Sequence, residues 1–222
     1  MLITDTRLTR WPLPAAAAVL WATALLIAAV PSPSLVPLPG TWQLDFEVRD
    51  LPQRITLHLP GWDRPRAFWF FPYTVINNTG REVDFYPSFT LLTNTFRVYP
   101  ANVALRQPVF EVVRARYADA IPLLEPEENV TGRLLVGPDN ARDSVALFEE
   151  FDPNARAVRV FVGGLSNETV TVPSPAETGR AGGKPKEFLL RKTLMLEYQA
   201  PGDAFDPDQR VMLYRGREWV MR

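Results

Sequence analysis

The sequence predicts an all-β fold, an antiparallel β-sandwich or barrel with one short helix. Three observations lead to this prediction. Apolar and polar residues alternate over many short runs, turn-forming residues separate these runs, and a single segment shows a helical period. The 222 residues are 46% hydrophobic and 22% charged, which is an ordinary composition for a globular protein.

The first alternating run covers residues 41–49. Trp42, Leu44, Phe46 and Val48 fall on one face of it, and polar residues fall on the other, which is typical of a half-buried strand. The other strand-like runs are equally short and are bounded by Pro, Gly, Asn or Asp. They cover residues 54–60, 68–76, 81–87, 88–94, 95–100, 132–136, 144–151, 157–165, 187–199 and 210–222.

One segment departs from this alternation and predicts a helix over about residues 108–119. Val109, Val113, Tyr117 and Ala120 follow one another at helical spacing, and Pro108 is tolerated in a first helical turn. We expect this helix to connect two strands as a crossover.

The run 68–71, Phe-Trp-Phe-Phe, places rings on both faces of a strand. The favoured interpretation is a central strand, covered by a second sheet on one face and by the helix on the other. The alternative is that the face of Trp69 and Phe71 is exposed and binds a ligand. Asn77-Asn78-Thr79-Gly80 then predicts a hairpin turn into residues 81–87.

The N-terminus reads as an export signal. Arg7 and Arg10 precede an uncharged apolar segment, residues 15–30. Cleavage near Ala28 would make residues 1–30 a signal peptide. Residues 11–30, left uncleaved, approach the length of about 20 residues that spans a bilayer and would anchor the chain in a membrane.

A proline-rich linker, residues 31–40, and a single domain, residues 41–222, are predicted to follow. The expected location is therefore extracytoplasmic: periplasmic, secreted or anchored.

Composition argues against several chemistries. The net charge of −1 gives no electrostatic footprint for nucleic acid, and the chain has no cysteine and one histidine, His58. We predict no cofactor and no catalytic residues. Asp203, Asp206 and Asp208 are weak calcium candidates, since carboxylate oxygens suit calcium but the calcium-loop pattern is missing. A hydrolase would need two carboxyl groups as acid and base. The candidates are Glu149 and Glu150 in one group, and Glu125, Glu127 and Glu128 in another.

The stretch 68–95 resembles a family of uncharacterised exported bacterial proteins that carry an Ig-like β-sandwich domain. The shared features are an aromatic strand, Tyr-x-Val-x-Asn-x-Thr-Gly from Tyr73, and a following Pro-x-Phe-x-Leu strand from Pro87. Residues 108–116, 151–169 and the closing segments after 196 extend the resemblance over about 41–222. It implies an exported Ig-like fold and no assigned activity.

These features together predict a non-enzymatic structural or protein-interaction module of the cell envelope. The alternative is a carbohydrate-binding module. Candidate binding residues are Trp62, Trp69, Phe71 and Tyr86, whose rings would stack on a sugar or a partner protein. A hydrolase that uses loop carboxylates is the third hypothesis.

Overall fold

The computed structural model describes residues 31–101, 106–174, 187–201 and 211–222. In chain order its elements are β1 Asp45–Val48, β2 Gln53–Leu57, β3 Arg66–Ile76, β4 Val83–Phe85, β5 Ser88–Thr93, β6 Val98–Pro100, α1 Arg106–Arg116, β7 Leu124–Glu125, α2 Glu127–Val130, β8 Gly132–Leu134, η3 Pro138–Asn140, β9 Arg142–Glu149, β10 Ala157–Gly163, β11 Thr169–Pro173, β12 Glu187–Gln199 and β13 Leu213–Met221.

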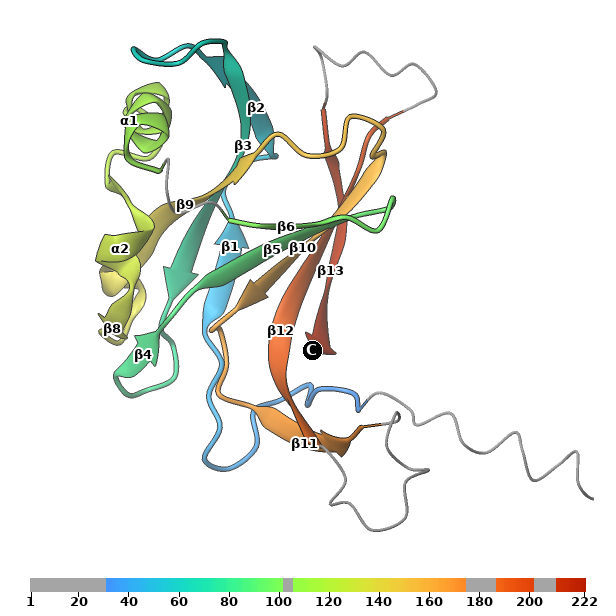
Figure 1. Ribbon diagram of the computed structural model, residues 1–222. Coiled ribbons are helices and arrows are strands. Elements are labelled where there is room, and N and C mark those ends of the chain that lie inside the picture. Colours follow the sequence, from blue (N-terminus) through green and yellow to red (C-terminus); the bar gives the residue numbers. More distant parts are fainter. Residues whose placement is uncertain (1–30, 102–105, 175–186, 202–210) are drawn as a thin grey trace, which may run out of the picture. The chain divides into compact units, whose positions relative to one another are not determined.

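The strands form two main sheets and a small third one (Figure 1). The first sheet has the order β1-β3-β9-β7, with β2 also paired to β3. The second has the order β11-β12-β10-β5-β6, with β13 also paired to β12. The third is the pair β4-β8. The short β7 runs parallel to β9, and the other described pairs are antiparallel.

Strand β3 is paired along both edges. One edge faces β9, and the other faces β2 over its first half and β1 over its second half. Pro72 lies between these two partners, and its carbonyl accepts a hydrogen bond from Arg49 N at 3.0 Å. In an antiparallel ladder the N–H and C=O of one residue point to the same edge. The missing N–H of Pro72 therefore falls between β2 and β1, where a proline is tolerated in a central strand.

Both faces of β3 are buried. Trp69, Phe71 and Tyr73 face the second sheet, and their cluster includes Phe89 of β5 and Val160 of β10. Phe68 and Phe70 face the other way and pack with Val109, Phe110, Val113 and Tyr117 of α1 and the residue after it. Figure 1 shows α1 on the side of β3 and β9 that faces away from the second sheet. The interpretation of residues 68–71 as a central strand covered on both faces is confirmed.

The hairpin predicted between β3 and β4 is wrong. The turn forms at Asn77–Gly80, where Gly80 has a φ of +78° and Asn77 Oδ1 accepts a hydrogen bond from Thr79 N. However, β4 pairs with β8 instead of β3. Because β1, β2 and β9 already occupy both edges of β3, no edge is left for β4.

The prediction of an all-β fold is confirmed. The predicted helix is present as α1 and follows β6 of the second sheet and precedes β7 of the first. The helix covers Arg106–Arg116 in place of 108–119, and Ala120 follows it as an exposed residue. Residues 1–30 lie outside the described residues. Among the residues that the structure describes, no helix is both long and apolar enough to cross a membrane.

The segment predicted as a linker is tied to the domain, because Pro31–Arg222 forms one compact unit. We call Ser34, Glu168 and Lys192 the Ser34 clasp. Ser34 N donates to Glu168 Oε1 at 2.8 Å, and Ser34 O accepts from Lys192 Nζ at 2.5 Å. Lys192 Nζ also pairs with Glu168 Oε2 at 3.1 Å and lies 5.2 Å from the centroid of the Trp219 ring. Both backbone groups of Ser34 are thus satisfied by two opposite charges.

The Ser34 clasp holds ionised groups away from water. Lys192 is 1% exposed and Glu168 is 8% exposed. Burial alone would raise the pKa of Glu168, but hydrogen bonds from Ser34 N and Lys192 outweigh it, so that the pKa is lowered from its ordinary value. Glu168 therefore stabilises the folded state as a carboxylate.

The contribution of Glu168 to stability is expected to disappear in acid. The pKa of Glu168 in the folded state lies below its unfolded-state value of about 4.5. The contribution is therefore complete at a pH above the unfolded-state pKa, and it is lost as the pH falls through the folded-state pKa. Glu168→Gln leaves Lys192 buried without a counter-ion and should cost about 3 kcal/mol at pH 7. Denaturant unfolding of both proteins from pH 7 downward measures the difference, which should shrink toward zero. A difference that stays constant with pH would contradict this account.

A glycine at the start of the β10–β11 connection is required by a close backbone approach. Gly164 has a φ of +86°, and a Cβ there would lie 2.2 Å from Tyr86 O. Gly80 has a similar φ of +78° but nothing within 4 Å of a Cβ.

We expect Gly164→Ala to destabilise the fold more than Gly80→Ala. The control variant, Gly80→Ala, should lose about 1 kcal/mol of unfolding free energy, because alanine is strained in the left-handed conformation. Gly164→Ala should lose about 3 kcal/mol, because the carbonyl of Tyr86 must also move. Chemical denaturation of the two variants measures the difference. Equal losses would show that the contact with Tyr86 has no cost.

Candidate functional site

Two of the aromatic residues predicted to bind a ligand are inaccessible. Trp69 is 0% and Phe71 is 5% exposed. Trp69 packs on Phe151 at 5.0 Å between ring centroids, and Phe71 packs edge-on against Phe148 at 5.3 Å. The prediction that these two rings contribute to a binding surface is wrong, because the second sheet covers that face of β3.

The other two predicted aromatic residues are separate from each other. Trp62 is half-buried against Phe68, and the guanidinium of Arg66 lies 5.2 Å from the centroid of its ring. Tyr86 is 65% exposed on the loop before β5. The structure does not bring the four predicted rings together on one surface.

Three of the five acidic residues considered for catalysis form ion pairs with arginines. Glu150 pairs with Arg54 at 2.5 Å and accepts a hydrogen bond from Trp69 Nε1 at 3.1 Å. Glu149 pairs with Arg66 at 2.6 Å, and Glu125 pairs with Arg142 at 2.8 Å. Glu127 and Glu128 lie in the first turn of α2, where Glu127 is half-buried and Glu128 is exposed. Glu125, Glu149 and Glu150 are thus each paired with a different arginine.

The metal candidates Asp203, Asp206 and Asp208 fall in 202–210, outside the described residues. In the described part of the chain, no three His, Asp or Glu side chains gather in a way that could hold a metal ion. His58 lies on the surface, with Nε2 3.0 Å from Trp62 O.

The feature that departs most from ordinary packing is the tip of the β5–β6 hairpin, residues 94–97. Phe96 is 89% exposed and adopts a φ of +60°, which makes it the sole non-glycine residue with positive φ among the described residues. A bulky side chain in this conformation costs about 1–2 kcal/mol. The hairpin tip thus combines backbone strain with an apolar ring exposed to solvent.

Backbone and hydroxyl hydrogen bonds impose this conformation. Phe96 N donates to Thr93 O at 3.0 Å, and Thr93 N donates to Arg97 O at 3.0 Å. Arg97 N in turn donates to Thr93 Oγ1 at 3.1 Å. Thr93 therefore closes the turn from both its main chain and its side chain.

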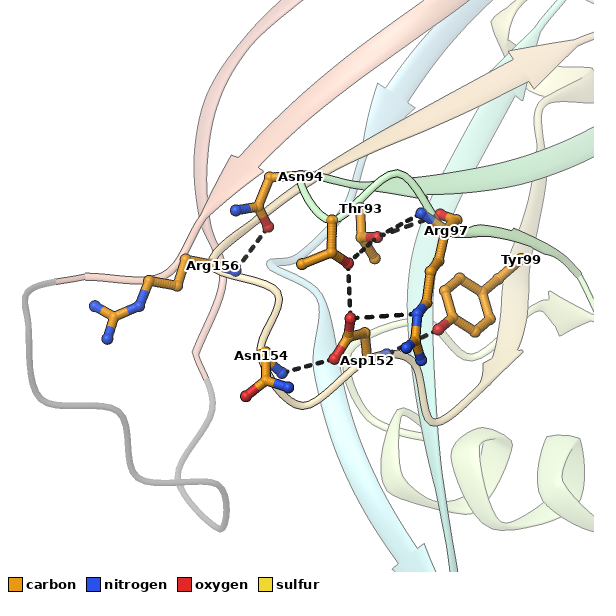
Figure 2. A network of polar contacts seen from close by, with 8 residues as sticks. Thr93, Asn94, Arg97, Tyr99, Asp152, Asn154 and Arg156 are labelled. Atoms are coloured by element: carbon orange, nitrogen blue, oxygen red, sulfur yellow. Dashed lines mark hydrogen bonds and ion pairs between the residues drawn. The ribbon is translucent and has the colours of Figure 1, made fainter.

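Asp152, in the connection between β9 and β10, fixes the hairpin tip from the side (Figure 2). Its Oδ2 accepts from Thr95 Oγ1 at 2.7 Å and lies 3.6 Å from Arg97 Nε, and its Oδ1 accepts from Asn154 N at 2.9 Å. Asp152 N donates to the hydroxyl of Tyr99 at 3.1 Å. This carboxylate joins two loops that lie far apart in the sequence.

A second contact secures the same two loops. Asn94 Oδ1 accepts hydrogen bonds from Arg156 N at 3.0 Å and Ala157 N at 3.2 Å, and Asn94 N donates to Ala157 O at 2.9 Å. Figure 2 shows the side chain of Asn94 directed toward Arg156, and Asp152 between Asn154 and Arg97. The base of the hairpin tip is therefore held at two points.

The environment of Asp152 keeps it ionised. The hydrogen bond from Thr95 lowers its pKa most, and those from Asn154 and the charge of Arg97 add to this effect, while burial opposes it. A carboxylate with a lowered pKa is unsuited to donate a proton at neutral pH. The network around Asp152 is thus suited to positioning the hairpin rather than to acid catalysis.

Basic and apolar groups surround Phe96. A hollow of about 330 Å³ adjoins it, lined in part by Leu92, Arg159, Glu197 and Arg215. Val98, which is 58% exposed, lies opposite Leu92 in the β5–β6 ladder. Arg159 pairs with Glu197 at 2.8 Å and Arg97 lies 3.6 Å from Asp152, whereas Arg215 is exposed and donates to Gln199 Oε1. The hairpin tip is an apolar patch with a basic border.

In comparisons with known proteins, no family model, no curated protein and no solved structure matches the chain.

Sequence reasoning assigned Phe96 to a strand over 95–100 and missed its position at a turn. The available signal was Thr93-Asn94-Thr95, since Asn and Thr favour turns through side-chain bonds to the main chain. That signal predicts the turn, but it does not predict a phenylalanine in a left-handed conformation.

Asp152→Asn is expected to loosen the hairpin tip without unfolding the sheets. The amide can still accept from Thr95, but it loses the charge that faces Arg97. The amide hydrogen of Arg97 should exchange roughly tenfold faster, as measured by hydrogen exchange, while amides of β3 keep their protection. Equal acceleration in β3 would mean that Asp152 stabilises the whole fold and not the hairpin.

Proposed function

We propose that the protein is an exported or membrane-anchored, non-catalytic interaction protein of the cell envelope, and that the hairpin tip is its contact site. The observation that carries the proposal is Phe96, which is strained, 89% exposed and held in place by the Asp152 network. Strain of this kind persists where the surrounding structure enforces it, and it gathers at functional sites. The apolar export or anchor segment at 11–30 supports the extracytoplasmic location.

We further propose an Ig-like β-sandwich for the domain. The two main sheets contribute their inner faces to one core, which supports this assignment, as does the resemblance of residues 41–222 to exported Ig-like proteins. Loops at the ends of such sandwiches commonly carry the binding residues, and the hairpin tip is one of these loops.

The partner that fits the hairpin tip is a protein with an apolar pocket bordered by carboxylates. A single exposed ring fills a pocket better than it covers a flat surface, and buried aromatic anchors dominate many interfaces. Arg97, Arg159 and Arg215 would lie at the rim, where opposite charges speed and orient association.

Phe96→Asn separates the proposed role from a structural one. Asparagine tolerates positive φ, so the variant should gain about 0.5–1 kcal/mol of stability. It should also lose partner binding by more than tenfold, because the ring that enters the pocket is gone. Denaturant unfolding measures the first effect and titration of the identified partner the second. A variant that is more stable and binds fully would refute the proposal.

The partner is identified by placing a photo-crosslinking phenylalanine analogue at position 96 of the full chain in its own cells. Position 86 is the matched control, since Tyr86 is also an exposed aromatic residue. It precedes β5, whereas Phe96 follows β5. We expect a discrete protein adduct from position 96 and none from position 86. Identical adducts, or none from either position, count against the proposal. A glycan bound through Tyr86 or Trp62 would support the carbohydrate-binding alternative instead.

A further inference from the structure

A second hollow lies on the outer face of the second sheet, apart from the hairpin tip. It has a volume of about 240 Å³, and Ser88, Thr90, Phe161, Gly163, Arg191 and Arg222 are among the residues that line it. Ser88 lies opposite Gly163, and Thr90 lies opposite Phe161, in the β5–β10 ladder. Val158, Val160 and Val162 alternate with Phe161 and Gly163 and point into the core, which places the hollow on the outside of the sheet.

Gly163 creates the space in this surface. A Cβ at that position would lie 2.4 Å from Ser88 Oγ, so a larger residue would displace the hydroxyl that lies over the glycine. The hollow is therefore a depression in the sheet, with the glycine and the ring of Phe161 among its walls.

The hollow offers side-chain hydrogen-bond donors, and its described lining includes no Asp or Glu side chain to receive them. Arg191 and Arg222 form no ion pair with any described residue, and the described lining residues include no Asp or Glu. Within the described part of the chain, the hydroxyls of Ser88 and Thr90 also make no hydrogen bond. Two guanidiniums and two hydroxyls are thus available to one ligand.

Contacts with Phe161 and Arg191 hold Arg222 in position without a ligand. Its guanidinium carbon lies 4.2 Å from the centroid of the Phe161 ring, and its backbone pairs with Arg191 through two hydrogen bonds of 2.7 and 3.1 Å. Partial burial lowers the pKa of Arg222, although an arginine remains protonated at neutral pH. A guanidinium that is partly removed from water and pairs with no described Asp or Glu gains from an anion placed beside it.

We propose that this hollow is a binding site for a phosphate group, carried either by a small soluble phosphate or by the headgroup of an anionic lipid. Guanidinium groups match the geometry of phosphate through paired N–H donors, and hydroxyls complete the shell around its oxygens. The volume admits one phosphate group with part of the molecule attached to it. This site does not depend on the proposed role of Phe96.

The test measures binding of inorganic phosphate to the full chain by calorimetry and binding of the full chain to vesicles of phosphatidylglycerol or phosphatidylcholine. Arg191→Gln and Arg222→Gln should each weaken binding at least tenfold. Arg159→Gln is the matched control, because Arg159 lies on the same face of β10, carries the same charge and pairs with Glu197 outside the hollow. It should change binding less than twofold, and Phe96→Asn should leave it unchanged.

Each outcome decides the proposal. Saturable phosphate binding with this variant pattern supports a soluble ligand. Binding to phosphatidylglycerol vesicles alone, with the same pattern, supports a lipid headgroup. An equal loss in Arg159→Gln shows non-specific attraction to a basic surface and overturns the proposal, as does the absence of saturable binding to phosphate and to both vesicles.

Discussion

The burial of β3 on both faces is the constraint on which the rest of the fold depends. Four consecutive rings, Phe68–Phe71, alternate between two environments, and each ring contributes about 2–3 kcal/mol only when it is removed from water. Burial of one face requires the second sheet, and burial of the other requires α1. The edges of β3 are occupied as well, so β4 must find β8 as its partner. A strand with no free face or edge cannot act as a binding surface.

The pattern of alternation predicted most of the strands, because each depends on residues close in sequence. β12 covers the predicted 187–199, and the two-sided covering of residues 68–71 follows from the rings themselves. Short elements with little periodicity were missed. β11 was missed although Val170 and Val172 alternate with threonines, because the run is only five residues long. α2 is a single turn, and β7 has two residues that gain strand geometry only by pairing with β9.

The contacts that build the candidate sites join residues far apart in the chain, and local pattern does not predict such pairs. Asp152 meets Thr95 across 57 positions, and Lys192 meets Ser34 across 158. Sequence alone identified Asp152 only as part of a turn signal. It gave no indication that Phe96 is strained, because the left-handed backbone is imposed by Thr93 and Arg97 and not by the phenylalanine.

The two proposed sites share a physical origin in the uneven covering of the sheets. Both described α-helices pack against β9 of the first sheet, so the outer face of that sheet is occupied. No described helix lies on the outer face of the second sheet. The buried charges of Lys192 and Asp152 are paired with opposite charges, whereas the side chains of Arg191 and Arg222 pair with no described Asp or Glu. The left-handed backbone of Phe96 costs stability, and this cost is the reason for which we propose a partner at the hairpin tip.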